Sequence, residues 1–178
     1  MRIKSVRINN FKSIRDSNQF DVADVTCLVG KNESGKTALL QALYRLNPVV
    51  PEHGLYDITE DYPRADVEEY RQRVEADSDS HEIVVRADFE LDEQEITLIE
   101  GDFGTGVLKS PIVSLSKGYA NQLFVELKVD EEVAVRSVIR SAGLPADIEA
   151  DALDHSTLKD LSHFLNSKAE GQAKAFAV

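Results

Sequence analysis

The N-terminal residues alternate apolar and polar side chains in the manner of β-strands. Val6 and Ile8 lie two positions apart with a charged residue between them, which predicts one face of a strand over residues 1–10. Phe20 and Val22 repeat this spacing and predict a second short strand. The chain therefore begins with β structure.

The next thirty residues change period. Residues 25–29 are apolar and rich in β-branched side chains, which predicts a third, buried strand. The single cysteine, Cys27, falls in this run, so we expect a small buried apolar residue and not a reactive thiol. Residues 38–46 then place apolar side chains at helical spacing, and Pro48 predicts the helix end. The leucines that define this spacing are Leu39, Leu40, Leu43 and Leu46.

Beyond the predicted helix the pattern becomes irregular and then β. Residues 48–80 carry turn formers, and one short helix is expected over 66–74. Period-two alternation predicts strands over 82–91, 107–115 and 119–129. Lys117-Gly118 is expected to form the hairpin turn between the last two.

Helix signals dominate the C-terminal part. Asp92 is followed by an acid three residues later, which is typical of a helix cap. Asp130 is expected to cap a helix that runs through Ala142 and ends at Gly143. A short segment near 146–153 and a helix over 156–169 follow.

Between the predicted third strand and the helix lies a phosphate-binding pattern. Its fixed positions match G-x-x-x-x-G-K-[ST], and strand, glycine loop and helix is the order that gives this pattern meaning. Backbone N–H groups at a helix N-terminus attract a polyphosphate, and glycines let the backbone approach it. The predicted nucleotide-binding residues are Gly30, Lys31, Asn32, Glu33, Ser34, Gly35, Lys36, Thr37 and Ala38.

Two of these side chains have specific expected roles. Lys36 is expected to reach the β- and γ-phosphates of a nucleotide, and the Thr37 hydroxyl is expected to ligate Mg²⁺. The predicted cofactors are therefore ATP and Mg²⁺. A GTPase would also need D-x-x-G and N-K-x-D, and neither string occurs in the chain.

The composition narrows the kind of protein and the partners that can be expected. The 178 residues carry a net charge of −12, 42% hydrophobic and 29% charged residues, as a soluble cytosolic globular protein would. Residues 52–102 hold eighteen Asp or Glu against four Arg, whereas residues 1–47 hold eight Lys or Arg against four acids. Because such an acidic chain repels a phosphate backbone, tight nucleic-acid binding by this chain alone is not expected.

Two stretches resemble one family. Residues 8–14, Ile-Asn-Asn-Phe-Lys-Ser-Ile, resemble the opening "I-x-N-F-[KR]-S" of the SMC/RecF-like branch of ABC-type ATPases, which includes OLD-family nucleases and phage-defence ATPases. Residues 30–37 with the following helix resemble its "G-x-N-x-[SA]-G-K-[ST]". The resemblance is specific over residues 1–47. In that family the basic residue of the opening lies near the nucleotide phosphates, which implies that Lys12 contacts ATP.

The resemblance implies a fold class and a domain organisation. We expect an α/β fold, the N-terminal half of an ABC-type P-loop NTPase head, over residues 1–129. Its antiparallel β-subdomain would span 82–129. Residues 130–178 would be a helical C-terminal segment, the start of a truncated insertion.

The family's catalytic strand, an apolar run ending in Asp-Glu, and its L-S-G-G-Q signature have only weak counterparts. Residues 123–126 and 115–118 approach these patterns, but both fit strand and hairpin better. We therefore expect a chain that binds ATP without turning it over. The identity of the metal-sensing glutamine stays open between Gln94 and Gln122.

Further expectations concern partners and rival functions. The resemblance implies that ATP clamps two heads together in DNA repair or phage defence, with DNA bound only by the intact protein. Two rivals remain: a complete small phosphotransferase that uses the same loop, and a non-catalytic interaction module switched by nucleotide. No apolar run approaches the roughly 20 residues that a membrane helix requires, so no membrane partner is expected.

Overall fold

A computed structural model describes residues 1–31, 34–77 and 79–175. The chain divides into two compact units. The first comprises Met1–Glu90 and Ile112–Glu126, and the second comprises Leu91–Pro111 and Leu127–Val178. Among the described residues, no helix has the length and apolar character needed to cross a bilayer.

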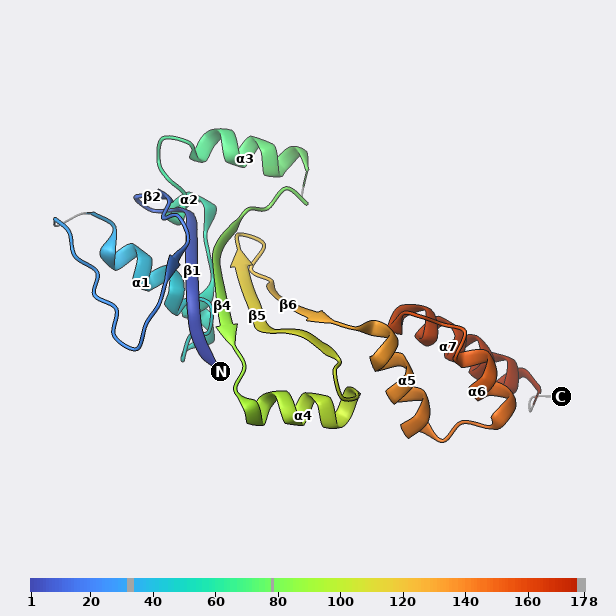
Figure 1. The fold of residues 1–178 in the computed structure, drawn as a ribbon. Helices are drawn as coiled ribbons and strands as arrows, with labels where there is room; N and C mark the ends of the chain where they lie inside the picture. The colour runs from blue at the N-terminus through green and yellow to red at the C-terminus, as the bar shows by residue number, and fades with distance from the viewer. Residues whose placement is uncertain (32–33, 78, 176–178) are drawn as a thin grey trace. The chain divides into compact units, whose positions relative to one another are not determined.

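A mixed α/β arrangement is built around one antiparallel sheet (Figure 1). Its strand order is β2-β1-β4-β5-β6, and β3 also pairs with β1. Strand β1 pairs antiparallel with β2, β3 and β4, and β4 pairs antiparallel with β5. The strands are β1 (Arg2–Phe11), β2 (Ile14–Asp16), β3 (Phe20–Asp21), β4 (Ile83–Glu90), β5 (Leu108–Gly118) and β6 (Leu123–Val129). The two predicted N-terminal strands are thus confirmed.

The core of the first unit lies between this sheet and helix α1 (Lys36–Tyr44), which contacts β1 and β4. Val6 and Ile8 of β1 are 1% and 0% exposed, as their alternation predicts. On the helix, Ala38 and Ala42 are buried while Leu40 is 57% exposed. The small alanines let α1 approach the sheet closely, which the leucine spacing alone does not predict.

Residues between α1 and β4 contribute more to the core than their irregular pattern suggests. They form η1 (Pro51–Gly54), α2 (Ile58–Asp61) and α3 (Val67–Ala76). Three tyrosine rings from this stretch pack with a fourth from just after β5 in edge-to-face, stacked and tilted pairs, and all four are buried. They are Tyr56, Tyr62, Tyr70 and Tyr119. Burial raises the pKa of Tyr62 to about 12, so its hydroxyl stays protonated.

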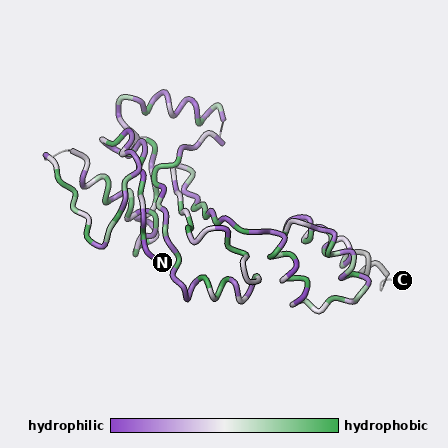
Figure 2. The backbone as a smooth tube through the Cα atoms, viewed as in Figure 1, coloured by the Kyte–Doolittle hydropathy of each residue, from purple (hydrophilic) through white to green (hydrophobic). Residues whose placement is uncertain are grey.

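The prediction of a third strand over residues 25–29 is wrong. Residues 25–29 have no regular secondary structure, Val25 and Val29 are 82% and 93% exposed, and Cys27 is exposed. Figure 2 shows hydrophobic residues along this connection between β3 and α1. A strand forms only when a neighbour takes its backbone hydrogen bonds, and the described residues provide no such neighbour here. The local pattern is that of a buried strand, but the partner is missing.

The predicted turn at Lys117-Gly118 is also wrong. Both residues belong to β5, and Lys117 pairs with Val85 beside a register shift in β4. A Cβ on Gly118 would lie 2.0 Å from the carbonyl oxygen of Glu82, so this glycine allows close backbone approach. The chain reverses later, between β5 and β6.

Most of the second unit is helical. It contains α4 (Glu93–Phe103), α5 (Glu131–Ala142), α6 (Ala146–Ala152) and α7 (Leu158–Ala175). The predicted caps are confirmed: Asp92 forms a capping box, Asp130 accepts from a backbone N–H of α5, and Gly143 ends α5 in a left-handed conformation. One buried apolar cluster of the second unit consists of Val135, Ile139, Ala152 and Leu161.

Candidate functional site

The glycine before α1 has a conformation that other residues rarely adopt. Gly35 is the N-cap of α1 with φ of 87°, in the left-handed region. A Cβ at this position would lie 3.1 Å from Ile14 Cγ1 and 3.3 Å from Ser13 Oγ. The backbone angle therefore favours glycine here, as the phosphate-loop pattern predicts, and a Cβ would also be tight against these two side chains.

The lysine of the pattern turns back over its own loop. Lys36 Nζ donates to the backbone oxygens of Gly30 at 2.8 Å and Lys31 at 2.6 Å, and to Ser34 Oγ at 3.3 Å. These acceptors are neutral, so an anion at this position would offer the ammonium group stronger, charge-assisted bonds. Asn32 and Glu33, also predicted as binding residues, lie outside the described residues.

The start of α1 differs from the starts of the other long helices. No side chain caps it, and its first turn contains no acid. By contrast, α4 and α5 are capped by aspartates, and α3, α4 and α5 carry acids in their first turns. The first backbone N–H groups of a helix lack internal partners and form the positive end of its dipole. In α1 no described side chain caps these groups, so they can donate to an external anion.

Thr37 lies in a hollow of about 600 Å³ at the start of α1. The hollow is lined by Lys12, Ser13, Gly35, Lys36, Thr37, Ala38 and Gln41. The Ala38 side chain is buried, so only its backbone can serve a ligand there. Lys12, predicted from the family resemblance alone, thus lies at the same hollow as the two predicted phosphate and metal ligands.

The backbone of Lys12 is strained. Its φ is 54°, in the left-handed region, which costs a non-glycine residue roughly 1–2 kcal/mol. Its N–H donates to the backbone oxygen of Asp61 at 2.5 Å. The Asp61 side chain is 5% exposed and forms an ion pair with Arg45, whose guanidinium lies 5.1 Å from the Phe11 ring centroid. A buried network therefore holds this unusual conformation.

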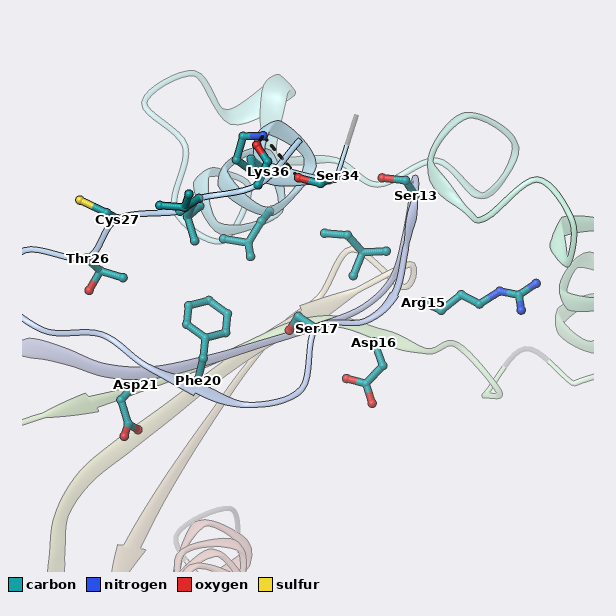
Figure 3. A pocket seen from close by; sticks show the side chains of 16 residues that line it. Ser13, Arg15, Asp16, Ser17, Phe20, Asp21, Thr26, Cys27, Ser34 and Lys36 are labelled. Atoms are coloured by element: carbon teal, nitrogen blue, oxygen red, sulfur yellow. Dashed lines mark hydrogen bonds between the residues drawn. The ribbon is translucent and has the colours of Figure 1, made fainter. Parts of the chain in front are cut away.

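A second hollow, of about 810 Å³, lies on the N-terminal side of the loop and includes Gly30, Ser34, Gly35 and Lys36 in its lining. Figure 3 shows the Phe20 ring pointing into it and the Arg15 side chain pointing away. Asp16 also lines it, and hydrogen bonds from the Arg7 guanidinium hold the pKa of this carboxyl below its usual range. The hollow thus joins an apolar wall to the phosphate loop.

Comparison with known protein families shows to which family the chain belongs. Residues 1–175 match the family described as AAA ATPase domain. The chain belongs to this AAA ATPase family. No curated protein matches the chain. The match supports an ATPase of the SMC/RecF-like kind, and membership makes ATP the expected ligand of the loop.

The two motif-like stretches of this AAA ATPase chain, residues 115–118 and 123–126, both lie in strands. Residues 115–118 lie inside β5, so they cannot begin a signature helix. In β6, the Glu126 carboxylate accepts a 2.8 Å hydrogen bond from Arg86. The described residues contain no cluster of three or more His, Cys, Asp or Glu that would hold a metal ion.

Two lining residues of the 600 Å³ hollow, Ser13 and Gln41, were not predicted. Gln41 accepts a hydrogen bond of 2.7 Å from Lys12 Nζ. It lies one helical turn after Thr37, so the i,i+4 spacing places both on the same face of α1. That spacing is a signal that the sequence contains, but it gains meaning only when the position of Lys12 is known.

Proposed function

We propose that this chain is the nucleotide-binding segment of an SMC/RecF-like ABC ATPase and that it binds ATP with Mg²⁺ at residues 30–38. The observation that carries the proposal is the left-handed Gly35 at the uncapped, acid-free start of α1, directly before Lys36. A Cβ would crowd this loop, and an anion would satisfy the N–H groups that no described side chain caps. When bound, Mg²⁺ would supply charge neutralisation of the phosphates, with Thr37 as its protein ligand.

Melting temperature tests this proposal directly. A ligand at one hundred times its Kd stabilises the native state by about 2.7 kcal/mol, which corresponds to roughly 5–10 °C for a chain of this size. We expect millimolar Mg-ATP to raise the melting temperature of the wild type by such an amount. Lys36→Ala should remove most of the shift, because a charge-assisted bond contributes about 1.5–3 kcal/mol.

Lys4→Ala is the matched control for the loss of a lysine. Lys4 lies on β1 and forms a surface ion pair with Glu90 at 3.1 Å, away from the loop. It should keep the full Mg-ATP shift. The absence of any shift in the wild type would refute nucleotide binding and favour the interaction module.

We further propose that the catalytic strand and signature come from residues outside this chain. The exposed apolar segment 25–29 supports this, because it has the composition of a buried strand and lacks a neighbouring strand among the described residues. Steady-state phosphate release by the isolated chain should then be negligible. Robust release that Lys36→Ala abolishes would refute the proposal, and turnover with a second substrate would favour the phosphotransferase.

The wider role follows from the resemblance. We propose that the intact protein uses ATP to bring two heads together and acts on DNA in repair or phage defence, in the OLD-like manner. The basic N-terminal residues support a role near a polyanion, whereas the net charge of −12 disfavours DNA binding by this chain alone.

A further inference from the structure

We propose that Gln41 is a positioning residue that holds the Lys12 ammonium group at the mouth of the phosphate loop as a second cation for the nucleotide polyphosphate. The inference rests on the proposed nucleotide binding. To the Lys12 contact that the family resemblance implies, it adds Gln41 and the hydrogen bond by which Gln41 joins the β1–β2 connection to α1.

Two contacts fix the end of the Lys12 side chain. Nζ donates to Gln41 Oε1 at 2.7 Å and lies 5.4 Å from the centroid of the Phe11 ring. An ammonium group has three N–H donors, so the amide of Gln41 leaves capacity for further acceptors. Since Lys12, Gln41, Lys36 and Thr37 line one hollow, those acceptors can be phosphate oxygens.

The backbone of Lys12 is fixed as well. The left-handed conformation is held from α2 by the bond to the backbone oxygen of Asp61, and Asp61 is held by Arg45 just after α1. Strained residues persist where the surrounding structure over-determines them, and such places cluster at ligand sites. Three segments, β1, α1 and α2, therefore contact one exposed lysine. A surface lysine that serves only to be solvated does not require so many contacts.

The neutrality of Gln41 is part of the inference. An acid at this position would form an ion pair with Lys12 and place a negative charge in the hollow, so it would oppose a polyanion. The amide orients the ammonium group and leaves its charge uncompensated. Gln41→Glu should therefore weaken binding more than Gln41→Ala.

The test is a double-mutant cycle on affinity for Mg-ATP and, separately, for Mg-tripolyphosphate, which lacks the base and sugar. Lys12→Ala should weaken both ligands about tenfold, the lower end for a charge-assisted bond. Gln41→Ala should weaken both by a smaller factor in the wild-type background and have no effect in the Lys12→Ala background. Lys12→Gly repeats the loss of the side chain in a residue that adopts φ of 54° without strain, in case Lys12→Ala folds poorly.

Lys4→Ala on β1 and Gln72→Ala on α3 are the matched controls, and both should keep wild-type affinity. Equal effects of Gln41→Ala with and without Lys12 would overturn the positioning role. Wild-type affinity in both Lys12 variants would overturn the contact itself. In either case binding that still depends on Lys36 leaves the proposed function intact, whereas a wild type that binds neither ligand refutes that function.

Discussion

At the scale of single residues, Gly30 and Gly35 share one motif but have different reasons to be glycine. Gly35 has a positive φ, which strains any other residue, and a Cβ there would be tight at 3.1 Å from Ile14, whereas a Cβ on Gly30 would meet the Ser34 side chain, with its hydroxyl oxygen at 2.8 Å. The Ser34 side chain can rotate away. Motif spacing treats the two glycines alike, and the structure separates them.

This difference gives a testable order of effects. Gly35→Ala should lower stability by about 1–2 kcal/mol from the left-handed backbone alone, roughly 2–8 °C in melting temperature, and should abolish the Mg-ATP shift. Gly30→Ala should lower stability by less than about 1 kcal/mol, because only a flexible side chain must move. Thermal denaturation with and without Mg-ATP checks both variants. Equal losses would show that the two positions are under the same constraint.

The residue scale also shows how far the sequence predicts the site. The loop residues were predicted from a local pattern, because a phosphate loop is contiguous in the chain, whereas Lys12 was predicted from the family resemblance. Gln41 and Asp61 were not, since their roles depend on contacts with Lys12 across 29 and 49 positions. No spacing rule encodes such contacts.

At the scale of elements, the helix ends are where local chemistry decides most. Asp130 accepts from the Val133 N–H at 3.4 Å and pairs with Lys109 at 3.3 Å, and these bonds, the first foremost, lower the pKa of the Asp130 carboxyl. Caps of this kind were predicted correctly because donor and acceptor lie within one helical turn. The strand over 25–29 was not, since strand formation depends on a distant partner.

A prediction follows for α5 (Glu131–Ala142). Because the pKa of Asp130 is lower in the folded state than in the unfolded state, its stabilising contribution is present above the unfolded pKa of about 3.9. It is lost as pH falls through the folded pKa. The protection factor of the first-turn amides of α5, which is the intrinsic exchange rate at each pH divided by the observed rate, should fall in Asp130→Ala at pH 7, and in the wild type only in acid. Asp130→Asn keeps the amide cap and should lose this pH dependence, so an unchanged acid response would contradict the assignment.

At the scale of the whole molecule, one apolar stretch of the chain is buried in a core and another is exposed to solvent. The core that contains residues of β1, β4 and the four tyrosines is buried, and Val6 within it is 1% exposed. The segment that enters the phosphate loop is open, with Val25 and Val29 on its surface. Both stretches have the apolar side chains of a strand, but only β1 forms one, and residues 25–29 do not.

Substitution of that open segment tests the whole-molecule picture. Val25→Lys and Val29→Lys should change the melting temperature by no more than about 1–2 °C, because exposed substitutions stay within roughly 0.5 kcal/mol. Val6→Lys buries a charge without a partner and should unfold the chain. A large loss of stability in the Val25 or Val29 variant that grows weaker on dilution would mean that another copy covers the segment. A large loss independent of concentration would mean that the segment packs within the chain, and it would remove the support for a catalytic strand supplied from elsewhere.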